Sequence, residues 1–242
     1  MTYTVDKIIA ILKSKGYPVA EDTSKDYNLN LVGIRSNNTV PNSFDDLFTV
    51  FWKNSKGWTF RVFPCTTDPG STWLLDKDGK ANPAGTGILK EGYHKDLWCL
   101  GLHQGKYEAL KQCSPVTVIR DFDKDNVLDF YAPDLSKLTK KEYTSNNIKT
   151  VEWLDASNKL MWREQTGIIG LNGHRANENG QSVQVGAWSA ACQVLQNRQV
   201  NNPDNQMVKV FEFDYMMFLA KKYFSTWRDK ISYTLLNQKD FV

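Results

Sequence analysis

Short runs of β-forming residues recur between turn signals along most of the chain. Runs rich in valine, isoleucine and aromatic residues, bounded by glycine, proline or aspartate, are typical of strands. The pattern predicts a mainly β fold, built as a β-rich sheet or barrel core with short N-terminal and C-terminal helices. The expected strands are residues 29–34, 47–52, 58–62, 98–102, 116–120, 148–154, 167–171 and 231–236.

Helical periodicity is confined to the two ends of the chain. An apolar stripe that follows Thr4 and stops at Gly16 predicts an N-terminal helix at about residues 4–15. Asp214 can cap a second helix that continues to about Phe224.

Length and composition narrow the class of protein. The 242 residues are 41% hydrophobic and 24% charged, which is ordinary for a globular protein. No repeat or linker divides them, so we expect a single domain over residues 1–242, with a catalytic-like core at about 28–236. The net charge of +3 is too weak for nucleic acid binding by phosphate neutralisation. Because no run of about 18 apolar residues occurs, we expect no membrane span.

The N-terminus and the cysteines bear on the compartment. The first residues form no apolar h-region, which predicts synthesis in the cytoplasm without a signal peptide. The four cysteines include no CxxC pair, which fits neither a zinc ribbon nor a disulfide framework. Cys65, Cys99 and Cys113 are expected to be small buried hydrophobes.

One segment combines a thiol with an imidazole. His174 stands at the end of a Gly-rich apolar run. The polar loop at residues 176–186 that follows is expected to be exposed and flexible. Cys192 comes after this loop, directly behind a series of small residues. A thiol near neutral pH needs a base to become a thiolate, and imidazole is the usual one. Small neighbours leave backbone N–H groups free to face an oxyanion.

This arrangement resembles the L,D-transpeptidase family of peptidoglycan enzymes. That family carries a His, a spacer, then Ser/Thr-His-Gly-Cys and a short hydrophobic tail. His174, the polar loop, Ser189 and Cys192 fill these positions, while two alanines replace the second His and the Gly of the motif. The resemblance covers about residues 167–195.

The resemblance implies a role for each residue of the motif. Cys192 would be the acyl-accepting nucleophile and His174 its general base. Ser189 would position the imidazole or the loop, and the backbone N–H groups of Ala191 and Cys192 would bind the oxyanion. No cofactor is required for this chemistry.

The implied substrate is a peptidoglycan stem peptide that bears a diamino acid. Arg175 could pair with one of its carboxylates, and Trp188 is the second candidate substrate-binding residue. The reaction would be cysteine-dependent acyl transfer or hydrolysis. In a phage or lysis-associated setting, such a protein would act at the cell wall after lysis or signal-independent delivery. The alternative is a non-catalytic cell-wall-binding or virion structural protein on the same scaffold.

An acidic loop suggests a calcium site. Asp121, Asp123, Asp125 and Asp129 stand at positions one, three, five and nine of a calcium-type loop. Strand-like runs flank it on both sides, so the site would lie in a β-hairpin loop whose second strand covers residues 128–131. A solvated acidic turn is the favoured interpretation and a Ca²⁺ site is the alternative, in which case we expect the ion to have a structural role.

Two further possibilities come from the histidines and the aromatic residues. His94, His103 and His174 could form a three-histidine zinc site, although no ligand motif fixes their spacing. Residues 107–111 are expected to form a helical turn close to His103. The 12% aromatic content could mark a glycan-binding module, but core packing explains rings within strands. The sequence leaves the oligomeric state open.

Overall fold

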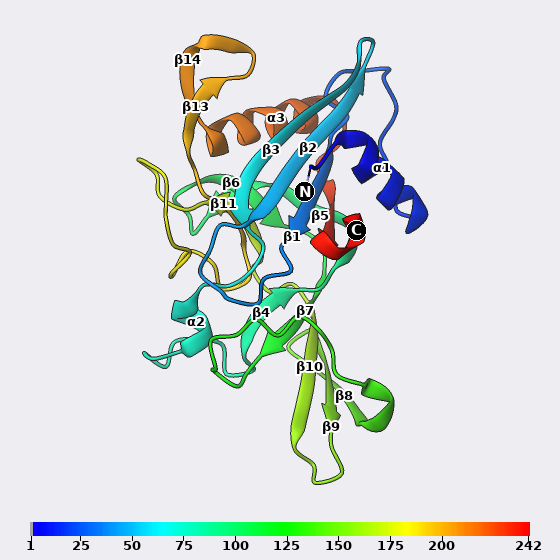
Figure 1. The fold of residues 1–242 in the computed structure, drawn as a ribbon, viewed down its shortest axis with the longest axis vertical. Helices are drawn as coiled ribbons and strands as arrows, with labels where there is room; N and C mark the ends of the chain where they lie inside the picture. The colour runs from blue at the N-terminus through cyan, green and yellow to red at the C-terminus, as the bar shows by residue number, and fades with distance from the viewer. Residues whose placement is uncertain (1) are drawn as a thin grey trace.

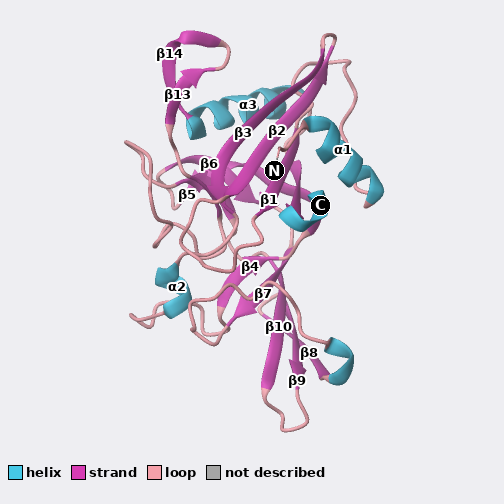
Figure 2. Ribbon diagram, in the orientation of Figure 1, coloured by secondary structure: helices cyan, strands magenta, loops and turns pink. Residues whose placement is uncertain are grey.

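Strands dominate the computed structural model, which describes residues 2–242 (Figure 1). Strand accounts for 41% of the chain and helix for 15%, so the prediction of a mainly β fold with terminal helices is confirmed (Figure 2). The strands are β1 (Asn30–Arg35), β2 (Asp46–Asn54), β3 (Gly57–Thr66), β4 (Thr86–Leu89), β5 (Gly92–His103), β6 (Tyr107–Gln112), β7 (Val116–Asp121), β8 (Thr139–Ser145), β9 (Ile148–Leu154), β10 (Leu160–Gly167), β11 (Asn172–Arg175), β12 (Gln193–Leu195), β13 (Gln199–Asn202), β14 (Asn205–Phe211) and β15 (Ile231–Asn237). The helices are α1 (Val5–Ser14), α2 (Ser71–Leu75) and α3 (Glu212–Thr226), with the 3-10 turns η1 (Leu135–Lys137) and η2 (Gln238–Phe241).

The strands form a closed barrel, a second sheet and a separate hairpin. The barrel order is β1-β15-β5-β6-β11-β12-β3-β2, and the second sheet has the order β4-β7-β10-β9-β8. Two barrel pairs, β1–β15 and β11–β12, are parallel. Parallel neighbours need a long crossover between them, and the segment that joins β11 to β12 is such a crossover. It carries most of the thiol motif.

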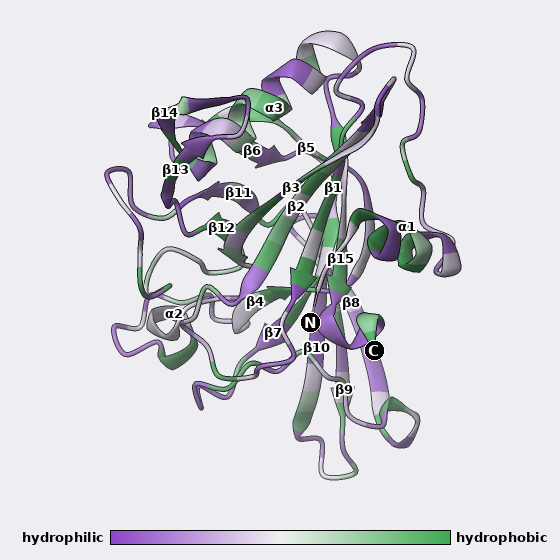
Figure 3. Cartoon of the chain, turned by 45° about the horizontal axis from the view of Figure 1, so that its top comes forward, coloured by the Kyte–Doolittle hydropathy of each residue, from purple (hydrophilic) through white to green (hydrophobic). Residues whose placement is uncertain are grey.

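Apolar side chains pack against both faces of β1. Leu31 faces the main core with α3, while its neighbour Val32 faces the outside, where α1 covers it with Ile8 and Leu12. Successive side chains in a strand point to opposite faces, which explains why every residue of β1 is buried. Figure 3 shows the apolar residues along the central strands and the polar character of the β13–β14 hairpin.

The two end helices follow the predicted pattern, whereas the short helix α2 was not predicted. Thr4 caps α1 by accepting a hydrogen bond from the backbone N–H of Lys7 at 3.3 Å. The C-terminal helix begins at Glu212, two residues before the predicted cap Asp214. Within residues 2–242, no helix combines the length and the apolar character needed to cross a bilayer.

Three local predictions were wrong. The strand expected at 167–171 ends with β10 at Gly167, and Gly170 has a φ of 80° that interrupts extended structure. Residues 107–111 belong to β6, because the preceding turn pairs them with β5. Residues 128–131 form no strand, since Leu128 and Phe130 enter a hydrophobic cluster instead of a ladder.

The expectation of three reduced, buried cysteines was also wrong in part. Cys99 and Cys113 form a disulfide, with Cα atoms 6.0 Å apart. The pairing of Cys99 with Lys111 across β5 and β6 places Cys113 two residues further on, diagonally opposite. Sequence spacing does not reveal this because the hairpin register creates it. Cys65 is free and buried, as expected.

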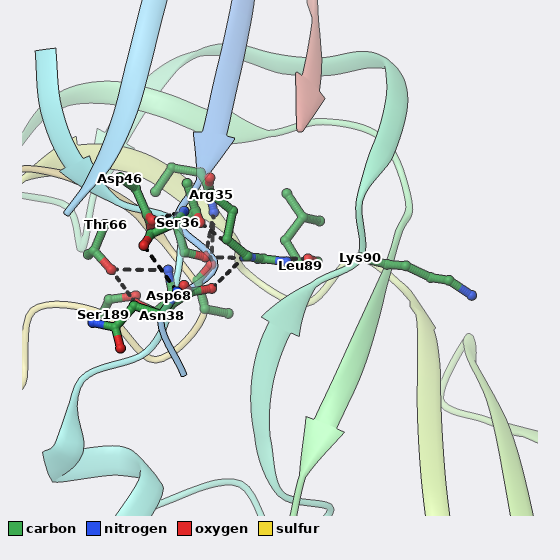
Figure 4. A network of polar contacts seen from close by, with 12 residues as sticks. Arg35, Ser36, Asn38, Asp46, Thr66, Asp68, Leu89, Lys90 and Ser189 are labelled. Carbon is green, nitrogen blue, oxygen red and sulfur yellow. Dashed lines mark hydrogen bonds and ion pairs between the residues drawn. The ribbon is translucent and has the colours of Figure 1, made fainter. Parts of the chain in front are cut away.

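A buried cation joins the barrel to the second sheet (Figure 4). Arg35, at the end of β1, is 1% exposed and its Nε lies 2.8 Å from Oδ1 of Asp68. Its Nη2 donates to the carbonyl of Leu89, the last residue of β4, at 2.9 Å. The guanidinium also lies over the ring of Phe130, 5.3 Å from the centroid. One side chain therefore holds three separate segments together.

A second carboxylate completes this network. Asp46 accepts hydrogen bonds from the backbone N–H of Ser36 at 2.7 Å, and from the backbone N–H and hydroxyl of Thr67 at 2.6 and 2.8 Å. Burial and the nearby Asp68 carboxylate raise the pKa of Asp46, and burial likewise raises the pKa of Asp68. A buried charge without a partner is costly. The guanidinium of Arg35 is therefore the cation that stabilises both buried carboxylates.

We expect Arg35→Met to lower the free energy of unfolding by about 3–5 kcal/mol, because it leaves both carboxylates without a cation. Loss of the cation raises their folded-state pKa values further, so the deficit should be larger at pH 8 than at pH 5, where protonation removes the charge. Urea denaturation at pH 5 and at pH 8 measures this loss of unfolding free energy.

Arg228→Met is the matched control, because Arg228 forms an exposed ion pair with Asp96. Its cost should stay below about 1 kcal/mol. An equal loss in the two variants would contradict a special role for the buried guanidinium.

Candidate functional site

The predicted nucleophile and base are brought to one face of the barrel by the parallel pairing of β11 and β12. Gly173 pairs with Gln193 and His174 with Val194, so Cys192 follows the same register next to Asn172. Residues two apart in a strand point to the same face. Asn172, His174 and Cys192 therefore share a face, with Cys192 displaced from His174 by about 7 Å along the strand direction.

Ser189 shapes the turn that carries the thiol. It is fully buried, and its hydroxyl donates to the carbonyl of Cys192 at 2.8 Å. Its own carbonyl accepts from the backbone N–H of Gly70 at 2.9 Å. Within the described residues, Ser189 makes no hydrogen bond to His174, so its contacts hold the turn rather than the imidazole. Figure 4 draws Ser189 together with the Arg35 network.

The residues on either side of the thiol are fixed by packing. The buried side chain of Gln193 accepts a hydrogen bond from the hydroxyl of Tyr233 at 2.7 Å, inside the barrel. Ala191 stands where the family motif has glycine, and its backbone avoids the left-handed region. Alanine is therefore compatible with this turn, and its methyl group packs close to Gly87, where a Cβ would lie 3.1 Å from it.

His174 is held in one tautomer. Its Nδ1 lies 2.7 Å from the carbonyl oxygen of Arg175, and a carbonyl only accepts, so Nδ1 carries the hydrogen. Nε2 is then an acceptor. It is buried and has no hydrogen-bond partner in the described part of the chain, and the residue is only 2% exposed. The ring stacks on His103 with centroids 3.9 Å apart.

Both titratable groups are neutral in the resting protein. Burial, assisted by His103, lowers the pKa of His174 to about 3. Burial raises the pKa of Cys192 to about 11, although hydrogen bonding by the backbone N–H of Asn172 acts in the opposite direction. Among residues 2–242 no hydrogen bond joins the thiol to the imidazole, and the Cys192 sulfur instead contacts the carbonyl of Gly170 at 4.0 Å.

Asn172 is the site residue that sequence reasoning missed. Its side-chain N–H donates to Nδ1 of His103 at 3.2 Å, while its Oδ1 is buried without a partner in the structure as described. With Nε2 of His174, this gives two unsatisfied buried acceptors on the face that carries the thiol. Buried polar atoms are usually hydrogen-bonded, so these two acceptors could take hydrogen bonds from a ligand. The two-residue spacing of Asn172 and His174 was the available signal.

A cavity of ≈ 470 Å³ opens next to this face. Its walls include His174 and both predicted substrate-binding residues, Arg175 and Trp188, but not Cys192. The Arg175 guanidinium lies over the ring of Tyr107, 4.0 Å from its centroid, and pairs with Glu178 at 2.6 Å. Trp188 is 45% exposed. The cavity thus combines a cation with exposed aromatic surface.

The loop at residues 176–186 is more tightly held than its composition predicts. The backbone N–H of Val185 donates to the carbonyl of Asn42 at 3.1 Å, and Val185 is completely buried. Ser182 is tied to Gln196 by a backbone hydrogen bond of 3.1 Å. The expectation of an exposed, flexible loop was therefore wrong for these positions, because a buried valine anchors the crossover.

The other predicted metal ligands lie elsewhere. His103 and His174 stack, but His94 bonds to the carbonyl of Lys90 and packs on Tyr233. Across residues 2–242, the three histidines form no group with metal-ligand spacing. The acidic residues predicted to bind calcium lie at the end of β7 and in the turn that follows it, outside the walls of the cavity.

Comparisons of this chain with protein-family models, with curated proteins and with solved structures found no match. The interpretation of the site therefore depends on its own geometry.

We expect thiol titration to find one reactive cysteine in the native protein. Cys192 is half-buried, Cys65 is buried, and Cys99 is bonded to Cys113. Denaturation without reductant should expose two thiols, and reduction should expose all four. Because burial raises the pKa of Cys192 to about 11, its rate should rise about tenfold per pH unit from neutral pH upwards.

Cys192→Ser is the control for this assignment, since it should abolish the native signal and leave one thiol after denaturation. A native signal that survives in this variant would show that another sulfur is accessible.

Proposed function

We propose that the protein is a cysteine acyltransferase or hydrolase that acts on peptidoglycan stem peptides, with Cys192 as nucleophile and His174 as general base. One observation carries the proposal. Nδ1 of His174 is committed to the carbonyl of Arg175, which leaves Nε2 as a free acceptor on the face that holds Cys192. Residues 167–195 also resemble the motif of L,D-transpeptidases.

The first step would transfer the thiol proton of Cys192 to Nε2 of His174 while the sulfur attacks the carbonyl carbon of a substrate amide. Because the resting pair is neutral, this transfer belongs to the attack itself rather than to a preformed ion pair. The approach would come from rotation of the Cys192 side chain, because rotation of His174 would break the hydrogen bond that fixes its tautomer.

The tetrahedral intermediate would collapse with cleavage of the C–N bond, and the imidazolium would give its proton to the leaving amine. The resulting thioester on Cys192 is resolved by an amine in transpeptidation or by water in hydrolysis. The backbone N–H groups of Ala191 and Cys192 are the candidate oxyanion donors, because in the chain as described neither donates a hydrogen bond.

The cavity supports an anionic peptide as substrate. Arg175 presents a guanidinium whose present partner, Glu178, is 69% exposed on its side chain. A substrate carboxylate can replace that exposed partner and bind the guanidinium in bidentate fashion. The Cys99–Cys113 disulfide favours a place of action outside the reducing cytosol, as expected for a protein that works on the cell wall.

The neutral resting pair also favours a second candidate, a non-catalytic cell-wall-binding protein on the same scaffold. Pure binding requires the cavity but no proton transfer. The two functions differ in whether a covalent intermediate forms on Cys192.

We expect incubation with purified stem tetrapeptides to give new peptide products and a thioester on Cys192 that mass spectrometry detects. Cys192→Ala should remove both. His174→Gln keeps a side chain of similar size without a base, and it should lower the rate at least ~100-fold, the usual contribution of a general base.

Two matched controls accompany these variants. Cys65→Ala removes the other free thiol, and His94→Gln replaces a half-buried imidazole outside the site. Both should retain the rate if they remain folded. Turnover that survives in Cys192→Ala would refute the proposal, and peptide binding without any turnover by the unaltered protein would establish the binding function instead.

A further inference from the structure

Carboxylates gather at the end of β7 and in the turn that follows it. Ligand oxygens of Asp121, Asp123 and Asp129 all lie within 4.8 Å of one another. In the described structure none of the three takes part in an ion pair. The lysine within the loop, Lys124, is instead bonded to Asp76 at 2.8 Å.

Asp121 provides an independent indication of a ligand. It is only 3% exposed, and its Oδ1 is buried with no hydrogen-bond partner in the part of the chain described. Its Oδ2 accepts from the backbone N–H of Asp129 at 3.3 Å. An unpartnered carboxylate oxygen in the interior is costly unless a proton or a metal ion satisfies it.

The backbone of the loop is coiled around these oxygens. Lys124 and Asn126 both adopt the left-handed conformation, with φ of 63° and 64°. Asp123 and Asp125 each accept a backbone N–H two residues further on, from Asp125 and Val127. Asn126 also has a buried Oδ1 without a partner among residues 2–242. The loop therefore combines buried, unpartnered oxygens on Asp121 and Asn126 with the exposed carboxylate of Asp123.

We propose that this loop binds one Ca²⁺ ion through the carboxylate oxygens of Asp121, Asp123 and Asp129. Two oxygens that bind the same ion at 2.3–2.6 Å can be at most about 5 Å apart, which the observed spacing satisfies. Mg²⁺ demands near-ideal octahedral geometry at shorter distances, and a loop with three carboxylates suits it less well. Asp125, which the sequence pattern also suggests, lies outside the group.

Electrostatics agrees with this assignment. Burial and the neighbouring carboxylates of Asp129, Asp123 and Asp125 raise the pKa of Asp121 to about 7. Burial, Asp123 and Asp125 also raise the pKa of Asp129. Without a cation, these carboxylates repel one another. A divalent ion bound between these carboxylates would offset that repulsion.

The expected role of the ion is structural. Immediately after the turn, Leu128 and Phe130 enter the hydrophobic cluster between the second sheet and Arg35. The backbone N–H of Leu128 also donates to the carbonyl of Thr39 at 2.9 Å. An ion that fixes residues 121–129 would fix these side chains as well.

The test measures thermal unfolding and calorimetric binding of the full chain after treatment with a chelator. Adding CaCl₂ up to about 10 mM should give one binding event per chain. Where Ca²⁺ exceeds its dissociation constant 100-fold, the midpoint should rise by about 5–10 °C. MgCl₂ at the same concentration should give a much smaller shift.

Variants locate the site. Asp123→Asn changes an exposed residue, so it should fold normally and lose most of the Ca²⁺-dependent shift; Asp121→Asn should lose the shift entirely. The control is Asp155→Asn, because Asp155 accepts backbone N–H groups in another exposed turn and belongs to no acidic group. Its shift should match that of the unaltered protein.

Three results would overturn the proposal. They are the absence of any shift with Ca²⁺ in the unaltered protein, a full shift in Asp123→Asn, and an equal response to Mg²⁺. None of these readouts depends on peptide turnover, so the calcium site and the proposed acyl transfer are tested separately.

Discussion

The architecture depends on one buried guanidinium that serves two carboxylates. Arg35 binds Asp68 directly and reaches Asp46 through the hydroxyl of Thr67, which accepts from the guanidinium and donates to the carboxylate. The same side chain bonds to the last residue of β4 and covers Phe130. Because none of these charged groups has access to water, β1, β2, β3 and β4 must meet in one fixed arrangement.

That junction also supports the candidate site. The turn that carries Cys192 is tied through Ser189 to Gly70, which follows the Asp68 region, and through Gln193 to the carbonyl of Thr67 at 3.3 Å. The thiol is therefore positioned by the barrel interior, whereas the face it shares with His174 keeps unsatisfied acceptors. A rigid support beneath a polar, incompletely bonded surface is what a binding or catalytic site requires.

The two sheets carry different kinds of chemistry. The barrel provides the imidazole and the thiol from adjacent parallel strands, while the second sheet ends in the acidic turn at residues 121–129. Both regions contain buried polar atoms that the described chain does not satisfy, on His174 and Asn172 in one and on Asp121 and Asn126 in the other. Arg35 joins the barrel to the second sheet through the carbonyl of Leu89 at the end of β4.

Strand alternation, capping and small-residue runs are local signals, so the mainly β class, the end helices and the residues of the thiol motif could be predicted from the residues alone. The parallel register that sets Asn172 beside Cys192, the Cys99–Cys113 bond and the assignment of residues 107–111 to a strand became clear from the folded chain. Each of these depends on pairing between distant segments, which overrides local propensity and leaves no trace in the spacing of residues along the chain.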